Sequence, residues 1–391
     1  MNKKLIAAAV SAAVVAPVAS QADVVVYGNI TNAIVSADTD SFADPNDKNG
    51  AILTESRTDI DTVSSRVGIK ASSDLGNGMT ANGRYEWATG SDNADQAFGT
   101  TRLAKVGLSG SFGSVDVGQQ WSTFYNTIGS MVSPNYSVGV PLGGYFRTGN
   151  TIQYTNSFGP VNLGLDIRAD DDEGGRDAQG DGVGVGITFN PASNLTVGLA
   201  YDSSDGVPGA AGSKADTEET DLVDDSGNPI TRNIDAVAPT HDEGDSEIFG
   251  IAVKATFGGF WASAGYQSEE VDGAAAIACV PTPNAQGACD DNLADYIPGR
   301  AAREEVETDY YQLWVGGALS DSTSWTLGYG ESEEEQKGVE DITTDRVALA
   351  VNHKLGGGMH LFFEYQDGTT EQKGAKDLEA NKALLGFRIN F

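Results

Sequence analysis

Residues 381–391, the last of the chain, read NKALLGFRINF, and apolar side chains take every second position from Ala383 to Phe391. Lys382, Arg388 and Asn390 stand between them. A period of two indicates a β-strand with one apolar face and one polar face. Soluble chains usually end in polar residues that fray, whereas this one ends on an aromatic residue. The pattern predicts a terminal strand that is paired along both edges and faces an apolar medium on one side.

Apolar alternation of the same kind recurs in residues 161–167, 183–189, 195–201, 249–253, 311–315, 325–329, 347–351 and 359–365. The connections between such segments are of two kinds that take turns. Seven are short and rich in Gly, Asn or Ser, beginning at Ser73, Gly110, Ser157, Asn190, Phe257, Ser320 and Leu355. Eight are long and polar, near residues 37–61, 89–100, 121–149, 170–181, 203–246, 269–308, 331–342 and 367–380. This order predicts sixteen antiparallel strands, with both chain ends on the short-turn side.

The arrangement of the connections decides between a β-sandwich and a barrel. A sandwich has no reason to place every long loop at one end, whereas an outer-membrane barrel has short periplasmic turns and long external loops. Strands of about ten residues, tilted by about 40°, cover roughly 25 Å of bilayer. Aromatic residues near the predicted strand ends are typical of interfacial girdles; they are Tyr27, Tyr85, Trp87, Tyr154, Phe158, Phe257, Trp261, Trp325, Tyr329, Phe363 and Tyr365.

We therefore predict an all-β fold, a sixteen-stranded antiparallel transmembrane β-barrel that forms a single domain over residues 23–391. The hydrocarbon core of a bilayer offers no partner to an open sheet edge. The last strand must then pair with the first strand, which begins at Val24. Phe391 is expected at the periplasmic rim.

The N-terminus predicts export. MNKK gives a positive start, an Ala-rich apolar run follows, and SQA at residues 20–22 is a small-residue cleavage site. This is the pattern of a secretory signal peptide over residues 1–22, with the mature chain beginning at Asp23. A membrane-anchor helix fits less well, because the run is shorter than the roughly 20 residues that a span needs.

The two cysteines, Cys279 and Cys289, lie close together in the sixth long loop. In an exported protein such a pair most simply forms a disulfide, here closing a small loop. Zinc needs more ligands than this region offers.

Acidic residues dominate the charge, with 56 Asp and Glu against 24 Lys and Arg and a formal net charge of −32. Such a chain repels nucleic acid and attracts cations. Clustered carboxylates in the long loops can bind Ca²⁺ or Mg²⁺, and weak bridging to lipopolysaccharide phosphates is left open. The simpler interpretation is a set of solvated external loops. The three histidines, His241, His353 and His360, accompany no G-x-S-x-G motif, so neither an enzyme nor a cofactor is expected.

Several stretches resemble the trimeric general porins of Gram-negative outer membranes. They are SSRVGIKASSDLGNG from Ser64, TTRLAKVGLSGSFGSVDVGQQ from Thr100, FRTGNTIQYTNSFGPV from Phe146 and the closing FRINF. The resemblance implies a homotrimer in the outer membrane, whose third loop, about residues 121–149, folds inward and narrows the pore. It also implies that the barrel-assembly machinery recognises Phe391.

The same resemblance places three arginines, Arg66, Arg102 and Arg147, on the basic wall of the constriction. By strand parity Lys70 shares the inward face with Arg66, and Arg84 and Glu86 also point inward. Two features depart from the family's pattern. Residues 121–150 contain no Asp or Glu, and offer Phe124, Tyr125, Tyr136 and Tyr145 instead, which predicts a neutral, aromatic loop. Lys105 falls by parity on the face that meets lipid.

The expected function is a water-filled channel for passive diffusion of small hydrophilic solutes and ions. A first alternative is a channel selective for sugars, oligosaccharides or an anion, since the loop aromatics suit stacking. A second is a surface adhesin or receptor barrel that binds a partner through its long acidic fifth loop. Acidic loops enrich cations at the mouth and the arginines favour anions at the neck. Because salt screens the exposed mouth first, cation preference at low salt is expected to fade or reverse at high salt.

Overall fold

The computed structural model describes residues 22–42, 48–90, 99–169, 181–205, 216–223, 229–234, 245–272, 305–337 and 340–391. The strands are β1 (Asp23–Phe42), β2 (Ile52–Thr62), β3 (Arg66–Gly76), β4 (Met79–Ala88), β5 (Thr101–Gly110), β6 (Gly113–Trp121), β7 (Arg147–Thr148), β8 (Thr151–Phe158), β9 (Val161–Arg168), β10 (Gly182–Ala192), β11 (Leu195–Ser204), β12 (Asp216–Val223), β13 (Pro229–Ile234), β14 (Ser246–Phe257), β15 (Phe260–Val271), β16 (Val306–Ala318), β17 (Thr323–Gln336), β18 (Ile342–Gly356), β19 (Met359–Gln372) and β20 (Leu378–Asn390). Two helical segments, η1 (Tyr125–Gly129) and α2 (Ser130–Val132), lie in the third loop.

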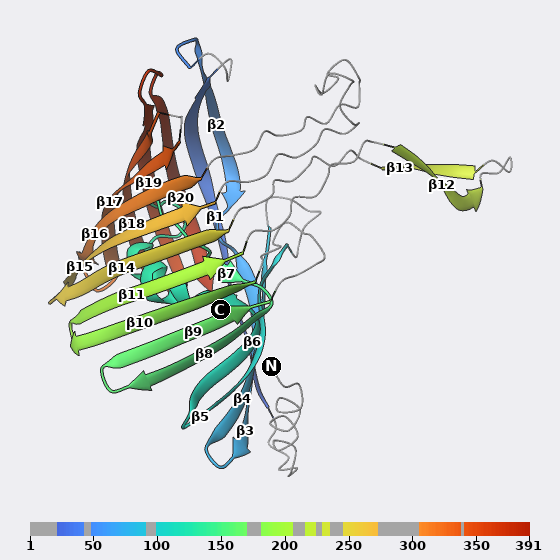
Figure 1. Cartoon of the computed structure of the whole chain (residues 1–391), viewed down its shortest axis with the longest axis vertical. Coiled ribbons are helices and arrows are strands. Elements are labelled where there is room, and N and C mark those ends of the chain that lie inside the picture. Colours follow the sequence, from blue (N-terminus) through green and yellow to red (C-terminus); the bar gives the residue numbers. More distant parts are fainter. Residues whose placement is uncertain are drawn as a thin grey trace.

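Eighteen of these strands form one antiparallel sheet that closes into a barrel (Figure 1). They make sixteen passes, because β2 and β3 pair in succession with β1, and β7 and β8 pair in succession with β6. The predicted number of strands and their antiparallel order are therefore confirmed. The remaining pair, β12 and β13, is a separate hairpin in the fifth long connection, where the sequence predicted only loop.

The barrel closes between the last strand and the first, as predicted. β20 pairs with β1 from Asn29↔Asn390 to Thr39↔Ala380. Phe391 extends this seam, because its N–H donates to the Gly28 carbonyl at 3.1 Å and its carbonyl accepts from the Gly28 N–H at 3.0 Å. Phe391 is 57% exposed at the end of the chain. Continuous pairing along the seam meets the condition for a barrel in hydrocarbon, where backbone groups cannot be left without partners.

The seven short turns lie where the sequence predicts them, but several long loops are shorter than predicted, the first, seventh and eighth most of all. β1 runs to Phe42 and β2 starts at Ile52, so the first loop spans residues 43–51 instead of 37–61. The seventh and eighth loops shrink to residues 337–341 and 373–377. Strand pairing continues here past the apolar band, where both faces are polar and alternation gives no signal. The predicted signal peptide, the cysteine pair and His241 lie outside the described residues.

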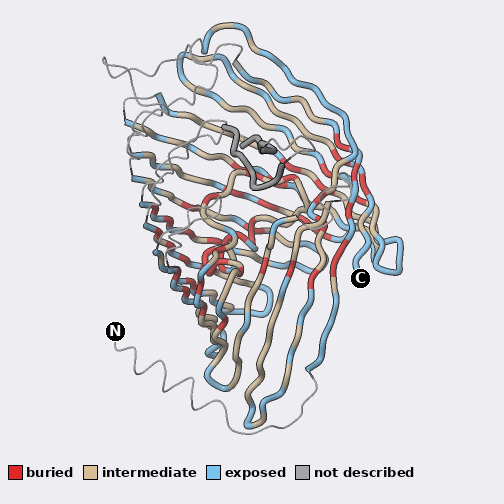
Figure 2. The backbone as a smooth tube through the Cα atoms, turned by 90° about the vertical axis from the view of Figure 1, so that its right-hand side faces the viewer, coloured by how far each residue is buried: buried red, intermediate tan, exposed pale blue. Residues whose placement is uncertain are grey.

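Buried or half-buried residues alternate with exposed ones along much of the barrel wall (Figure 2). On β1, Ile30 and Ile34 are 50% and 56% exposed on the outside, whereas Asn29 and Thr31 are 3% and 0% exposed inside. Two residues predicted for the aromatic girdles belong to the inner face instead. Tyr27 hydrogen-bonds to Glu86, and Trp261 packs against the core that the third loop builds. Aromatic residues beside a turn satisfy the girdle pattern on either face, so the girdle assignment was wrong at both positions.

The third loop folds into the barrel and builds a hydrophobic core inside it. Its buried residues include Phe124, Ile128 and Val132, which belong to one cluster with Trp314 and Phe362 of the wall. Small wall residues make room for the loop; a side chain at Gly250 would meet the Phe124 ring at 2.9 Å. The loop therefore packs against one half of the barrel wall, from β10 round to β20. Within the described ranges no helix is both long and apolar enough to cross a membrane.

Candidate functional site

A single carboxylate on β4 gathers three arginines from three strands. The Glu86 side chain is 1% exposed, and its Oε1 accepts from Arg102 Nε at 2.9 Å and lies 3.8 Å from Arg66 Nη1. Its Oε2 accepts from Arg84 Nη2 at 2.7 Å and from the Tyr27 hydroxyl at 2.8 Å. Charge-assisted hydrogen bonds of this kind fix the guanidinium groups in place. One negative charge among three positive ones leaves this wall cationic.

The aromatic side chains at the start of the third loop face the same cluster. Trp121, the last residue of β6, lies under the guanidinium groups of Arg102 and Arg147, whose Cζ atoms are 5.9 and 5.4 Å from its ring. Tyr125 stacks on Trp121 with ring centroids 4.5 Å apart. Burial raises the pKa of Tyr125, whose phenol is uncharged at neutral pH. Cations over aromatic faces are held without being neutralised.

Arg388 on β20 adds a further basic group from the closing strand, and this residue was not predicted as part of the site. With the Asn29 amide turned so that both its ends are satisfied, Asn29 Oδ1 accepts from Arg388 Nη2 at 3.1 Å and from Arg66 Nε at 3.2 Å. Arg388 stands between the outward-facing Phe387 and Ile389, so the alternation of the strand could have predicted that it points inward. The resemblance to porins covered Arg388 only as part of the assembly signal. Lys70 also lies inside, with its Nζ 4.4 Å from the Tyr27 ring centroid.

Lys105 faces the lumen, which corrects its predicted position on the lipid side. The pairing of β4 with β5 is irregular, since Glu86 pairs with Leu103 and the next residue, Trp87, pairs with Thr101. Arg102 is thus an extra residue, and such a β-bulge reverses the parity of all that follows. Lys105 Nζ consequently reaches Asp116 Oδ2 on β6 at 3.2 Å. The bulge lets Arg102 and Lys105, three positions apart, both point inward.

Wall residues hold the third loop at its start. Asp166 Oδ2 on β9 accepts from the Thr123 N–H at 2.8 Å. Beside it, Arg168 donates to both oxygens of Asp202 at 2.7 Å each, and Arg168 Nη1 lies 3.5 Å from Asp166 Oδ1. All three side chains are 3% exposed or less. A buried ion network of this kind is rigid because every displacement leaves a charge unpaired.

A second carboxylate holds the tip of the loop. Glu364 on β19 accepts backbone N–H groups from Tyr136 and Ser137 at 2.8 Å and from Val138 at 3.0 Å. On the returning arm, Gln267 Oε1 accepts from the Gly143 N–H at 2.9 Å. The loop contains no acidic residue of its own, and the wall supplies the acceptors that its backbone requires.

The other two loop tyrosines lie away from Tyr125. Tyr136 packs edge-on against Phe362 at 5.4 Å, and Arg388 Cζ lies 4.3 Å from its ring centroid. Tyr145 is held by its carbonyl, which accepts from Ser122 Oγ at 2.6 Å, and its phenol lies close enough to Arg168 to interact electrostatically. The structure thus brings together six of the predicted site residues, Arg66, Arg84, Glu86, Arg102, Tyr125 and Arg147. Tyr136 is connected to them through its contact with Arg388.

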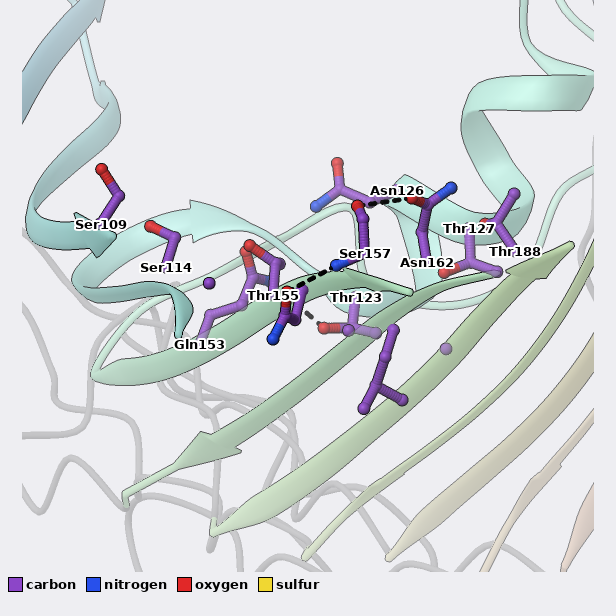
Figure 3. A pocket seen from close by; sticks show the side chains of 15 residues that line it. Ser109, Ser114, Thr123, Asn126, Thr127, Gln153, Thr155, Ser157, Asn162 and Thr188 are labelled. Carbon is purple, nitrogen blue, oxygen red and sulfur yellow. Dashed lines mark hydrogen bonds between the residues drawn. The ribbon is translucent and has the colours of Figure 1, made fainter. Parts of the chain in front are cut away.

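A polar cavity of about 420 Å³ lies beside η1, between the loop and strands β5 to β10 (Figure 3). Its lining carries hydroxyl and amide groups and no charged side chain among the described residues. Examples are Asn126 and Thr127 of the loop, Gln153 of β8 and Asn162 of β9. Gln153 Nε2 donates to Thr123 Oγ1 at 3.2 Å, which joins this lining to the loop. The lumen is therefore cationic along β3 to β5 and neutral around this cavity.

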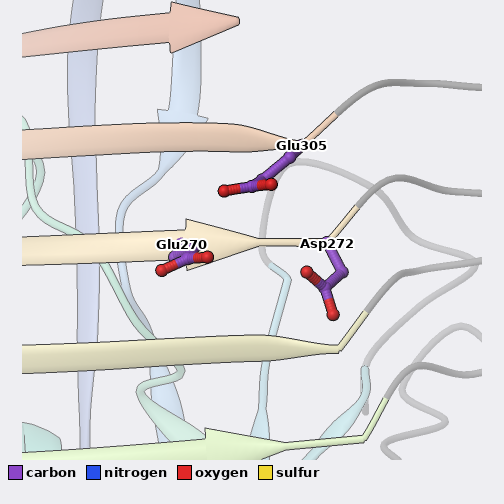
Figure 4. A group of neighbouring side chains, drawn as sticks. All are labelled: Glu270, Asp272 and Glu305. Atoms are coloured by element: carbon purple, nitrogen blue, oxygen red, sulfur yellow. The ribbon is translucent and has the colours of Figure 1, made fainter. Parts of the chain in front are cut away.

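The long-loop end of the barrel carries the opposite charge. Glu270, Asp272 and Glu305 stand exposed where β15 ends and β16 approaches, with carboxylate oxygens within 4.8 Å of one another (Figure 4). Exposed acidic groups of this kind are common without a bound ion. Their summed field enriches cations at this end.

A closed antiparallel barrel narrowed by its own third loop defines a transmembrane β-barrel of the porin type. A family model described as Gram-negative porin matches residues 7–373. The chain belongs to this family, and it is accordingly a multi-pass β-barrel of a Gram-negative outer membrane.

Curated relatives match part of the chain. Major outer membrane protein P.IB of Neisseria meningitidis serogroup A / serotype 4A is 33% identical over 127 residues, which cover 32% of this chain and 36% of that protein. Outer membrane protein S2 of Salmonella typhi is 27% identical over 214 residues, covering 44% of this chain and 55% of that protein. The chain thus spans about a third to about half the length of the curated relatives it matches.

Solved structures share the fold over nearly the whole chain. The anion-selective porin from Comamonas acidovorans superposes with a TM-score of 0.64 and 16% identity, covering 95% of this chain and 100% of that chain. The trimer form of OmpT from Vibrio cholerae gives a TM-score of 0.59 at 16% identity, over 95% and 99% of the two chains. At such identities the likeness establishes the fold alone.

Proposed function

We propose that the protein is a water-filled channel for the passive diffusion of small hydrophilic solutes and ions across the outer membrane. The observation that carries this proposal is the third loop, which folds into the interior and places the uncharged rings of Trp121 and Tyr125 beside the arginines around Glu86. A solute that passes this part of the wall meets fixed positive charge next to an aromatic surface. Such a channel needs no catalytic group or cofactor, and the proposal gives the protein no enzymatic role.

Selectivity in this proposal follows from the separation of charge along the pore. Arg66, Arg84 and Arg102 share the single carboxylate of Glu86, and Arg147 and Arg388 lie beside them, so the neck attracts anions. The exposed acids at the long-loop end attract cations. Screening lengths fall from about 10 Å at 0.1 M salt to about 3 Å at 1 M. Exposed charges lose influence first, and the neck then dominates.

The proposal includes the partners that the family resemblance implies. The chain assembles as a homotrimer, which is also the form recorded for a structurally similar protein, OmpT of Vibrio cholerae. The barrel-assembly machinery reads the terminal strand that ends in Phe391. The acidic loops face lipopolysaccharide, with divalent cations bridging carboxylates to its phosphates.

A substrate-selective channel is a second candidate, and one observation favours it. Trp121, Tyr125 and Phe146 form a continuous aromatic run, with Tyr125 and Phe146 centroids 5.0 Å apart. Arg102 and Arg147 border it. A ring-bearing or sugar-like solute that carries an anionic group fits such a surface. A receptor or adhesin role for the fifth loop finds no comparable support, because most of that loop lies outside the described residues.

Reconstitution in a planar bilayer tests the proposed function. Single insertions of the mature protein are expected to conduct, and to close in three equal steps if the trimer forms. Saturable block of the current by micromolar sugar or organic anion identifies the selective channel. A correctly folded barrel that inserts without conducting contradicts both channel proposals.

A further inference from the structure

Three basic side chains lie side by side at the short-turn end of the lumen, beside the tip of the third loop. They come from three neighbouring strands, since Lys354 of β18 pairs with His360 of β19, and His360 pairs with Arg388 of β20. Directly paired residues on antiparallel strands have Cβ atoms about 5 Å apart and share a face. From the sequence, His360 was one of three histidines without a catalytic motif, and no role was predicted for it.

The hydrogen bonds of His360 define which ring nitrogen titrates. His360 Nδ1 lies 2.9 Å from Asn352 Oδ1, and Asn352 Nδ2 donates to the Tyr136 hydroxyl at 2.6 Å. In this arrangement the amide oxygen accepts a hydrogen bond from Nδ1–H, which stays protonated whether the ring is neutral or charged. Nε2 is then the nitrogen that gains and loses its proton. The third loop therefore fixes the ring orientation through Tyr136.

The groups around His360 are mostly cationic. Lys354 and Arg388 flank it, Tyr136 approaches from the loop, and Glu364 lies further along β19 on the same face. Glu364 is 2% exposed and its oxygens accept three N–H groups of the loop, so it faces the loop tip. Among the described residues, no ion pair within 4.0 Å involves Lys354, His360 or Arg388.

We propose that Lys354, His360 and Arg388 form a binding subsite for small oxyanions, such as a carboxylate, phosphate or sulfate, which strengthens when His360 is protonated. Its role in transport rests on the proposed channel function. Arg388 links it to the neck, because Asn29 joins Arg388 to Arg66. An anion leaving the neck thus passes directly to a second cationic site.

The chemistry of the three groups suits an oxyanion. Arginine presents a planar fork of donors and lysine a compact point charge, and protonated His360 adds one donor at Nε2. The guanidinium of Arg388 is held by Tyr136, with Cζ 4.3 Å from the ring centroid, and its Nε donates to Asn390 Oδ1 at 3.0 Å. Preorganised donors of this kind bind an oxyanion with little further ordering.

Histidine titration by NMR in lipid nanodiscs tests the subsite without requiring conduction. The protein carries ¹³C-labelled histidine, and the pH is varied from 5 to 8 in sulfate or in chloride of equal ionic strength. Sulfate stays a dianion over this range. We expect saturating sulfate to raise the pKa of His360 by about half to one unit, which equals roughly three- to tenfold tighter binding to the protonated form.

His353 is the matched control, since it lies on β18 near the same turn end, with Nδ1 2.8 Å from Thr323 Oγ1. Its NMR signals are expected to be the same in sulfate and in chloride. His360→Gln should abolish the pH dependence of sulfate affinity measured by calorimetry, whereas His353→Gln should retain it. Equal shifts for both histidines, or none for His360, overturn the subsite. If the subsite responds to sulfate while the bilayer stays silent, the oxyanion site stands and the channel function fails.

Discussion

Arg66 and Arg388, which are separated by most of the chain, donate to the same oxygen of Asn29 at 3.2 and 3.1 Å once the Asn29 amide is turned so that both its ends are satisfied. They meet because β1 lies between β3 and β20 at the closing seam. The basic wall therefore spans the point where the barrel closes. Closure and the charge of the neck depend on one another, since Arg388 does not reach the cluster in an open sheet.

Replacing Glu86 tests whether one carboxylate organises the wall. Glu86→Gln removes the anion that three arginines share, so the anion-to-cation permeability ratio is expected to rise. The free energy of unfolding should fall by about 2 kcal/mol, because hydrogen bonds to a charged acceptor are lost. Reversal potentials and the temperature of heat modification on gels measure the two effects. Glu371→Gln, at an exposed position of β19, is the control that should change neither property.

Replacing Lys105 tests the inward position that the β-bulge creates. Lys105→Leu leaves the 7%-exposed Asp116 without its cation, and a loss of about 1–3 kcal/mol in unfolding free energy is expected. Denaturant titration of the folded barrel in detergent measures this loss, and adding Asp116→Asn should restore part of it. If Lys105→Leu instead stabilises the barrel, the side chain faces lipid and the bulge has been misread.

Releasing the tip of the third loop tests its anchoring. Glu364→Gln replaces one of the two oxygens that together accept three N–H groups with an NH₂ group, which is itself a donor. The tip should become mobile, and single-channel records should show more noise and a larger mean conductance. Gln366→Glu is a useful comparison, because it keeps an acceptor for the Gly139 N–H, 3.1 Å away, and should leave the noise unchanged. Equal noise in Glu364→Gln and the parent protein argues against this anchor.

The strand pattern was predictable because lipid contact imposes strict alternation and short turns need Gly or Asn. Asn77 and Gly78, with φ of 52° and 73°, illustrate the turn requirement. Parity failed at Lys105, where a bulge inserts one residue, and the girdle assignment failed at Tyr27, whose hydroxyl donates to Glu86 inside the barrel. The sequence of one strand alone predicts neither the bulge nor the hydrogen bond, because both depend on the neighbouring strand.

The arginines of the site were predictable one by one, but their common partners were not. Arg66, Arg84 and Glu86 follow from inward parity, whereas the role of Asn29 requires the register of the closing seam. Likewise, an acid-free loop predicted a neutral face, while the anchoring roles of Asp166 and Glu364 emerged only from tertiary contacts. The hydrogen-bond partners of the site residues thus depend on long-range strand pairing, which local sequence patterns do not predict.

The central claim is that an arginine neck lies behind an acidic mouth in a conducting barrel, and reversal potentials measure it most directly. They should be recorded under a fixed ratio of KCl concentrations, first at low and then at high mean salt, for the parent protein and for Arg388→Gln. We predict cation preference at low salt that fades or reverses toward anions at high salt, with a smaller change in Arg388→Gln. A reversal potential that stays constant across the salt range, and is equal in both proteins, would contradict the account.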